Sequence, residues 1–214
     1  MSLIVNEIFH SIQGESLYSG RPCVFIRLAG CNLRCSYCDT TYAYEAGTSL
    51  SIDEILETIK EFLCPLVEVT GGEPLLQADT PRLLDRLLSD GLEVMLETNG
   101  SIDLTPVNPD CIKIVDVKCP SSGASKHNRI DNFSLLTGRD QVKFVIGDAA
   151  DYAYAKSMLA ILPPELPHHH VLFSPVSAVL SPDTLGEWIL RDRLCVRLHL
   201  QLHKFIWPNV ERGR

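Results

Sequence analysis

The residues with the clearest potential for chemistry are three cysteines in one short stretch. Cys31, Cys35 and Cys38 follow the pattern C-x3-C-x2-C. Thiolates are soft ligands that select zinc, copper(I) or iron–sulfur clusters. A structural zinc site would need a fourth ligand, and no further Cys or His pair stands nearby at zinc-finger spacing. A [4Fe–4S] cluster held by three cysteines would leave one iron without a protein ligand, and such an iron can bind a reactant.

Two further stretches could bind ligands. Gly71-Gly72-Glu73-Pro74 follows a predicted strand. Glycines there let the backbone approach a ligand closely, although the same residues are common in plain turns. Asp39 and Thr40 follow the third cysteine. A Thr hydroxyl is a hard oxygen ligand that suits Mg²⁺, but these two residues taken alone favour a turn in which Asp39 bonds its own backbone.

The elements that must position these residues alternate along the chain. A capping box at Ser51 and Glu54 opens the first predicted helix, and the last one begins at Ser181 and carries Leu198 on its apolar side. Such alternation implies a parallel sheet with right-handed crossovers. About six strands are too few for a closed eight-stranded barrel. We therefore expect an α/β fold, a partial, open TIM-like barrel with helices outside and ligand sites after the strands. The strands are predicted at residues 23–29, 66–70, 92–98, 112–117, 141–146 and 171–173.

Composition limits the possible partners. The 214 residues, 45% hydrophobic and 21% charged, predict a single domain over residues 1–214. A net charge of −8 argues against a nucleic-acid-binding surface, which needs a basic face. No apolar run approaches the roughly 20 residues of a membrane span, and the N-terminus lacks an export signal. The other cysteines are scattered, which fits reduced thiols. We expect a cytoplasmic protein with no membrane or nucleic-acid partner.

The cysteine loop, residues 30–40, resembles the cluster loop of the radical S-adenosylmethionine (SAM) enzymes. In that family three cysteines hold a [4Fe–4S] cluster, and the open iron chelates the amino and carboxylate groups of SAM. The resemblance implies that Cys31, Cys35 and Cys38 hold the cluster and serve catalysis. Gly71–Pro74 matches the second family motif, which holds the SAM amino group. The residues implied to bind SAM are Tyr37, Cys38, Asp39, Gly72, Glu73, Lys118, Ser121 and Pro175.

One branch of this superfamily, the 7-carboxy-7-deazaguanine synthases (QueE), is resembled more closely. Cys38-Asp39-Thr40 has the form seen in that branch, where the Thr binds Mg²⁺, so Thr40 is implied to be a magnesium ligand. Ser11–Glu15 resembles its N-terminal substrate loop, although Ser16 replaces the Gly that often follows. Arg27 matches an Arg of that branch that binds the substrate carboxylate. A guanidinium offers a fork of donors that suits a planar carboxylate. The residues implied to bind substrate are Ile12, Gln13, Gly14, Glu15, Arg27, Thr70 and His203.

Simpler structural roles remain for some of these residues. Arg27 could form an ordinary salt bridge beneath a loop. Asp116 and Lys118 alternate on one strand face and could form only a structural ion pair, and Pro175 could simply end a strand. The resemblance nevertheless covers nearly the whole chain, and the C-terminal segment 199–214 is expected to close the pocket.

The resemblance also implies an activity. It is a ring contraction of 6-carboxy-5,6,7,8-tetrahydropterin to 7-carboxy-7-deazaguanine, with loss of ammonia, on the route to queuosine or other 7-deazapurines. The implied cofactors are a [4Fe–4S] cluster, SAM and Mg²⁺. A flavodoxin- or ferredoxin-like protein would supply one electron, and a homodimer is usual for the branch.

Two other functions stay open from the sequence. An activating enzyme of a glycyl-radical enzyme shares the cluster loop and the compact size, but it would need a surface for a large protein partner rather than a closed pterin pocket. A non-catalytic protein that carries zinc or a cluster is the second alternative. Its metal content would distinguish it, since zinc without iron would favour that function.

Overall fold

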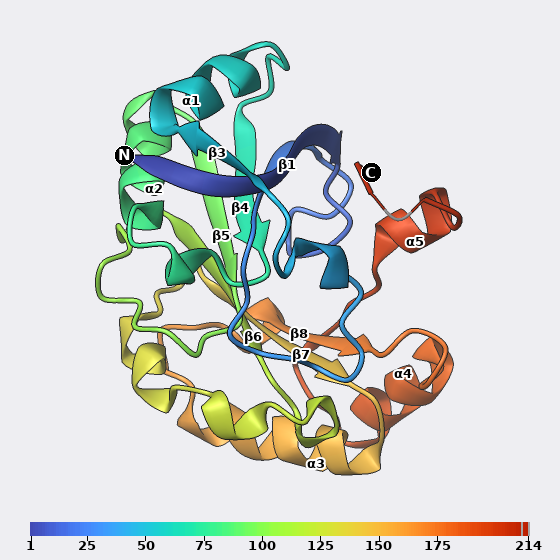
Figure 1. Cartoon of the computed structure of the whole chain (residues 1–214). Helices are drawn as coiled ribbons and strands as arrows, with labels where there is room; N and C mark the ends of the chain where they lie inside the picture. The colour runs from blue at the N-terminus through green and yellow to red at the C-terminus, as the bar shows by residue number, and fades with distance from the viewer. Residues whose placement is uncertain (211, 214) are drawn as a thin grey trace.

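One curved sheet organises the computed structural model, which describes residues 1–210, 212 and 213 (Figure 1). Its nine strands lie in the order β3-β1-β2-β4-β5-β6-β7-β8-β9. The strands are β1 (Ser2–Ile12), β2 (Pro22–Leu28), β3 (Thr48–Ser51), β4 (Leu66–Gly71), β5 (Glu93–Thr98), β6 (Ile112–Val117), β7 (Gln141–Ile146), β8 (Val171–Pro175) and β9 (Arg197–Leu198). The helices are α1 (Ile52–Lys60), α2 (Thr80–Ser89), α3 (Ala149–Met158), α4 (Pro182–Arg191) and α5 (Leu202–Ile206), with short 3₁₀ turns between elements.

The predicted open barrel of six parallel strands is confirmed. Strands β2, β4, β5, β6, β7 and β8 pair in parallel, each with the next. Three strands were not predicted. Strands β1 and β3 extend the sheet in antiparallel fashion beyond β2, and β9 adds a short parallel strand beyond β8. Because β3 and β9 are the two ends of the strand order, the sheet does not close.

The helices begin where the sequence indicates. The hydroxyl of Ser51 accepts a hydrogen bond from the Glu54 backbone N–H, and the Glu54 carboxylate accepts one from the Ser51 N–H, so the predicted capping box forms. The prediction for the last helix was wrong at its far end. Helix α4 ends at Arg191, because Arg193 takes a left-handed backbone conformation with φ of 52°, which a helix cannot continue through. Leu198 lies on β9 instead, 38% exposed.

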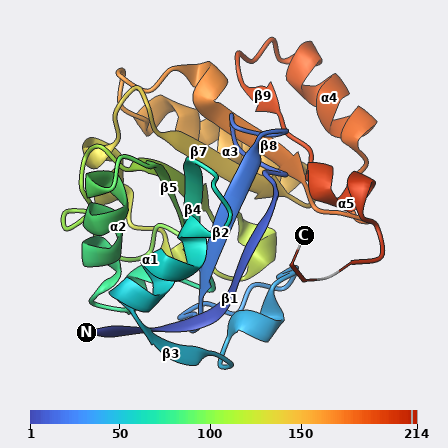
Figure 2. The same ribbon diagram turned by 90° about the horizontal axis from the view of Figure 1, so that it is seen from above.

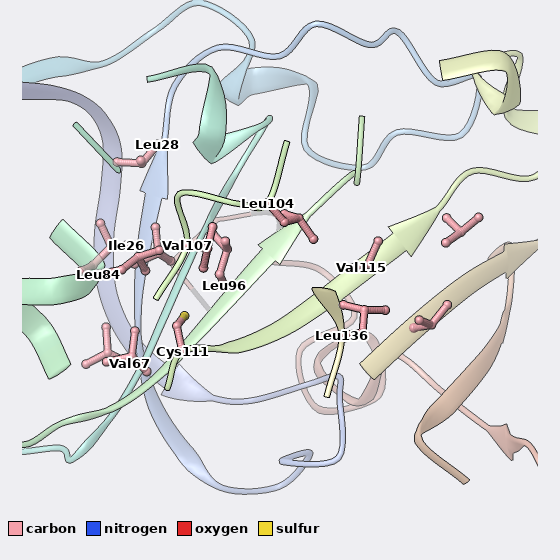
Figure 3. Packing of buried hydrophobic residues seen from close by; sticks show 14 of the residues in the cluster. Ile26, Leu28, Val67, Leu84, Leu96, Leu104, Val107, Cys111, Val115 and Leu136 are labelled. Atoms are coloured by element: carbon pink, nitrogen blue, oxygen red, sulfur yellow. The ribbon is translucent and has the colours of Figure 1, made fainter. Parts of the chain in front are cut away.

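Two apolar clusters occupy the two faces of the curved sheet. The larger one joins the outer face of the sheet to the helices and to the loop after β5, and Figure 3 shows part of it around Ile26, Leu96 and Val115. Figure 2 shows α1, α2, α3 and α4 arranged around that outer side. The smaller cluster fills the inner side near the strand starts, and it contains Cys23, Phe25, Leu66, Met95, Ile112 and Ile114. We call it the apolar plug. Because it fills one end of the barrel, ligands must enter from the carboxyl ends of the strands.

Helices long and apolar enough to cross a membrane do not occur in the described part of the chain.

Candidate active site

A cavity of about 940 Å³ lies inside the curved sheet, on the side of the strand ends. Most of the residues singled out from the sequence line it. They are Ile12, Gln13, Gly14, Glu15, Arg27, Cys31, Cys35, Tyr37, Cys38, Asp39, Thr40, Thr70, Gly72, Lys118 and His203. Glu73, Ser121 and Pro175 are not among its lining residues, although each stands beside one that is. The cysteine loop and the N-terminal substrate loop therefore face one shared space.

The cysteine loop is fixed in place at several points. It leaves β2 at Gly30, whose φ of 96° is left-handed and whose N–H donates to the Ala43 carbonyl at 2.8 Å. The Asn32 amide donates to the Ser101 hydroxyl at 2.8 Å. The Ser36 backbone N–H donates to the Ser122 carbonyl at 3.1 Å. Contacts to neighbouring loops on both sides therefore hold the three thiols at the mouth of the cavity.

The three thiols suit an iron–sulfur cluster better than a single ion. Each is free and partly exposed to the cavity. Burial raises the pKa of the Cys35 thiol, and the nearby Lys118 ammonium offsets only part of that rise. No group of three or more Cys, His, Asp or Glu side chains within the described residues gathers closely enough to hold one metal ion. Three thiols that face one cavity can hold a cluster and leave one iron open to a ligand, so the residues present fit the cluster.

Gly71 and Gly72, at the end of β4, let β2 and the cysteine loop pack closely against them. A Cβ at Gly72 would collide with the carbonyl oxygen of Gly30 and with the Cβ of Cys31. The backbones of the two motifs are therefore in contact, and only glycine permits it. The next residue, Glu73, is fully buried and accepts hydrogen bonds from the Asn99 backbone N–H at 2.7 Å and the Thr98 hydroxyl at 2.9 Å. Glu73 thus ties the loop after β4 to the loop after β5.

Asp39 and Thr40 stand at the edge of the cavity. The Thr40 hydroxyl donates to the Asp39 carboxylate at 3.1 Å. The Lys204 ammonium, from helix α5, lies 2.9 Å from the same carboxylate. Burial alone would raise the pKa of Asp39, but Lys204 and Thr40 hold it below its usual value. An ionised carboxylate beside a hydroxyl is an oxygen-rich site that suits a hard cation such as Mg²⁺.

Arg27 combines both roles that the sequence left open. Its Nε donates to the Glu7 carboxylate at 2.8 Å, and that carboxylate also accepts from the Tyr42 hydroxyl at 3.1 Å. The rings of Phe9 and Tyr42 each lie 5.8 Å from the guanidinium carbon. Within the described residues, neither Nη atom of Arg27 makes a hydrogen bond. The salt bridge therefore orients a guanidinium whose outer edge remains free for a ligand carboxylate.

A cluster of buried charges lies deeper, between the mouth and the apolar plug. The Lys143 ammonium is 2.8 Å from the Glu15 carboxylate and 3.4 Å from that of Asp116, and it also contacts Glu97. Burial would raise the pKa of Glu15, but Lys143 holds it well below its usual value. We call Glu15, Glu68, Glu97, Asp116 and Lys143 the polar floor. Glu68 and Lys143 were not predicted from the sequence, and Glu97, in a stretch that resembles the 7-carboxy-7-deazaguanine synthases, was given no role in the site.

The substrate-loop residue Gln13 faces this floor. Its amide oxygen accepts from the Glu15 backbone N–H at 2.9 Å, and its amide nitrogen donates to the Glu68 carboxyl group. The side chain is 2% exposed. Gln13 therefore holds the loop after β1 down on β4.

The C-terminal segment lies against two of these loops. The Gln201 amide donates to Glu15 at 2.8 Å and to Asp39 at 3.3 Å. The Leu202 N–H donates to the Gly14 carbonyl at 2.8 Å, and the ring of His203 packs on Gly14 where any side chain would collide with it. Residues lining the cavity from farther along are Trp207, Pro208, Val210 and Gly213. Residues 211 and 214 of the predicted closing segment lie outside the described residues.

The remaining predicted SAM-binding residues surround the far side of the cavity. Lys118 forms the ion pair with Asp116 that the sequence allowed, at 2.9 Å. Ser121 is bound to the Asp151 carboxylate through its backbone N–H at 2.9 Å and through its hydroxyl. The Tyr37 hydroxyl donates to the Val145 carbonyl at 3.3 Å. Beyond Pro175, the last residue of β8, Val176 and Ser177 line the cavity.

Comparison with known proteins gives one consistent result. The model of the Radical SAM superfamily matches residues 25–115. A 7-carboxy-7-deazaguanine synthase from Chlorobaculum tepidum is 49% identical, over 99% of this chain and 97% of that protein. One from Koribacter versatilis is 43% identical, over 98% and 99%. The crystal structure of QueE from Escherichia coli has the same fold, with a TM-score of 0.79 over 95% of both chains at 24% identity.

Proposed function

The chain belongs to the 7-carboxy-7-deazaguanine synthase family of radical SAM enzymes, and we propose how its cavity performs that family's reaction. The reaction is the ring contraction of 6-carboxy-5,6,7,8-tetrahydropterin to 7-carboxy-7-deazaguanine with loss of ammonia. It leads toward queuosine and other 7-deazapurines, and it depends on a [4Fe–4S] cluster, SAM and Mg²⁺. The observation that carries the residue assignments is one cavity faced by the three thiols, by Thr40 and by the free edge of Arg27.

The cysteine side of the cavity binds the cofactors. Cys31, Cys35 and Cys38 hold the cluster, and SAM lies along Gly72 and the loop at Lys118. When bound, the reduced cluster and SAM supply a carbon radical that can remove a hydrogen atom from the substrate. Glu73 and Ser121 support this site from behind, because Glu73 binds the loop after β5 and Ser121 binds Asp151 of helix α3, and neither lines the cavity. Tyr37, Asp39 and the backbone that follows Pro175 complete it.

The opposite side binds the pterin. The two Nη atoms of Arg27, which bond none of the described residues, receive the substrate carboxylate as a fork, while Glu7 keeps the guanidinium in plane with it. The Thr40 hydroxyl would hold Mg²⁺, a hard cation that would help to orient the substrate when bound. The backbone of Ile12, Gly14 and Glu15, with Thr70 on β4, faces the ring. A substrate fixed at its carboxylate can present only one carbon to the cofactor side.

The C-terminal segment excludes water. His203 packs on Gly14. Gln201 bonds Glu15 of the substrate loop and also Asp39, and Lys204 bonds Asp39. The described residues of this segment, 199–210, 212 and 213, therefore cover the ring once it is bound and protect a reactive radical from solvent. The sheet takes strands from Ser2 to Leu198, so we infer that residues 1–214 work as one domain.

We further infer three features outside the cavity. A flavodoxin- or ferredoxin-like protein delivers the electron. Two copies form a homodimer, supported by exposed apolar side chains near the C-terminus, among them Leu190 and Phe205. The enzyme works in the cytoplasm, where its eight cysteines stay reduced.

Anaerobic turnover tests the proposal. The reconstituted enzyme is incubated with SAM, a one-electron reductant, Mg²⁺ and 6-carboxytetrahydropterin, and products are identified by mass spectrometry. We expect 7-carboxy-7-deazaguanine, dependent on SAM and on iron. Formation of 5′-deoxyadenosine without the deazaguanine would contradict the substrate assignment and favour a glycyl-radical activating enzyme.

A further inference from the structure

Glu68 occupies a position where a carboxylate is unexpected. It lies on β4 two residues before Thr70, so both side chains point into the barrel. In the sheet it pairs with Phe25 on one side and Met95 on the other, two members of the apolar plug. Glu68 is 4% exposed, yet it lines the cavity. Its carboxyl group therefore forms the boundary between the plug and the ligand space.

The charges around Glu68 leave it without a counter-ion. The Lys143 ammonium of β7 already faces the carboxylates of Glu15, Glu97 and Asp116, from three other segments. In the described residues no Lys, Arg or His forms an ion pair with Glu68. A further buried negative charge would add repulsion and a large desolvation cost. The electrostatics of the polar floor therefore favour the neutral acid at this position.

The titration behaviour of the neighbouring groups agrees with this. Burial raises the pKa of Glu68 well above its usual value, and the charges of Glu97 and Glu15 raise it further, while Lys143 and the bond from Gln13 lower it. Cys23 on β2 also lies close, but burial raises the pKa of its thiol, so it stays neutral. The pKa of Lys143 is raised by its three carboxylates, so it stays charged. Neither group changes charge near neutral pH.

The two oxygens of Glu68 differ in their surroundings. One accepts the hydrogen bond from the Gln13 amide nitrogen. The other makes no hydrogen bond to any residue that the structure describes. In a neutral carboxyl group, that second oxygen carries the proton. An O–H donor thus stands at the cavity wall without a protein acceptor.

We infer that Glu68 is a carboxylic acid in the working enzyme, and that it donates a hydrogen bond to an acceptor atom of the bound heterocycle while it holds Gln13. The acceptor is a ring nitrogen or a carbonyl oxygen of the substrate, so this inference rests on the proposed function. A carboxyl group kept neutral by an apolar wall is an effective donor of this kind. The same carboxyl group also fixes the substrate loop, because its other oxygen accepts the hydrogen bond from Gln13.

Paired substitutions separate this role from that of a charged carboxylate. Glu68→Gln keeps the shape, the acceptor for Gln13 and a donor toward the ligand. We expect it to lose no more than about threefold in kcat/KM, whereas Glu68→Leu, which keeps only the shape, loses about 10- to 100-fold. Glu93→Gln, on the surface end of β5, is the matched control. A Glu68→Gln variant that folds normally but loses as much as Glu68→Leu would overturn the inference.

The pH dependence supplies a second test. As pH rises and Glu68 ionises, the donor is lost and KM for the substrate increases. Glu68→Gln has no proton to lose at this site, so its KM stays flat over the same range. The same rise in KM at alkaline pH in the wild type and in Glu68→Gln would contradict the assignment.

Infrared difference spectroscopy reads the proton directly and needs no turnover. The cluster-loaded wild-type enzyme is compared with Glu68→Gln and with Glu93→Gln. We expect the absorption of a protonated carboxyl group in the first comparison and not in the second. An enzyme that makes the deazaguanine but lacks this band refutes the inference alone, whereas a band without product refutes the proposed function alone.

Discussion

The mouth and the floor of the cavity are built on opposite principles. At the mouth, Cys31, Cys35 and Cys38 carry free thiols and Arg27 has two nitrogens without a hydrogen bond in the described structure. At the floor, the Lys143 ammonium meets three carboxylates. The polar groups of the mouth therefore gain their partners only when ligands bind. At the floor one ammonium bridges carboxylates from three segments, and we infer that these contacts hold the surrounding strands and loops in register.

The largest expected effect comes from breaking the mouth at a thiol. Cys35→Ala removes one of three cluster ligands, and we expect loss of iron and of all product formation. Cys195→Ala, at an exposed thiol far from the loop in sequence, is the control and should keep both. Iron content and product yield after anaerobic reconstitution measure the difference. Iron retained at the wild-type level in Cys35→Ala would exclude the cluster assignment.

Breaking the floor should destabilise the fold rather than remove a ligand. Lys143→Met leaves Glu15, Glu97 and Asp116 buried without their shared cation, and we expect a loss of about 3–5 kcal/mol in the free energy of unfolding. Lys156→Met removes a half-exposed lysine from its pair with Asp192 and should cost less than about 1 kcal/mol. Denaturant unfolding under anaerobic conditions compares the two. Equal stability of both variants would show that the floor does not hold the strands.

The pH dependence of stability is a second test of the polar floor. The pKa of Glu15 is lowered in the folded state, so its ionised form stabilises the protein at pH values above the carboxyl pKa of the unfolded chain. This stabilisation is lost as pH falls toward the folded-state pKa. In Lys143→Met the sign reverses, because protonation relieves the unpaired carboxylates. We expect wild-type stability to fall as the pH drops below about 4, near the carboxyl pKa of the unfolded chain, whereas the variant gains stability as the pH falls toward that value; parallel curves would disprove the pairing.

A smaller effect is expected for Arg27, whose guanidinium faces the cavity. Arg27→Lys keeps the charge but cannot offer two parallel donors, and we expect kcat/KM to fall about 10- to 100-fold with the cluster intact. Arg21→Lys, at the other end of β2 in an exposed pair with Glu93, is the matched control. A substrate analogue without the carboxylate should lose the same factor with the wild type. Normal turnover in Arg27→Lys would remove the carboxylate assignment.

The smallest effects are expected for Thr40 and Lys204, which stand at the edge of the cavity. Thr40→Ala should keep the cluster and weaken the response to Mg²⁺, whereas Thr41→Ala, at the next and exposed position, should not. Lys204→Ala removes a partly exposed pair with Asp39 and should change kcat/KM by only about threefold. Magnesium titrations of turnover measure both variants. An unchanged Mg²⁺ response in Thr40→Ala would contradict its role as a ligand.

The two regions also differed in how far sequence reasoning reached. The mouth was predictable because C-x3-C-x2-C and Cys38-Asp39-Thr40 are contiguous motifs, and their resemblance to the radical SAM enzymes and the 7-carboxy-7-deazaguanine synthases gave them their roles. The floor was not, because Glu68, Glu97 and Lys143 come from three strands and acquire meaning only when the sheet brings them together. Lys143 stands as a lone charge between Val142 and Phe144, a local signal that a buried ion pair is needed there.

The fold shows the same contrast between local and distant information. The six parallel strands followed from the alternation of apolar runs and helices, and the capping box marked the start of α1. Strand β9 has two residues, too few for a pattern, and the end of α4 depends on the backbone of Arg193. The pairing of β1 with both β2 and β3 is set by contacts across the sheet rather than by any local signal.

Hydrogen exchange with and without ligands tests the contrast between mouth and floor most directly. The cluster-loaded enzyme is measured alone and with saturating SAM, Mg²⁺ and substrate. We expect exchange to slow by at least about tenfold in residues 31–40 and 199–208, while β6 and β7 exchange slowly in both states. Unchanged exchange at the mouth, with new protection in β6 and β7 instead, would contradict the division of roles.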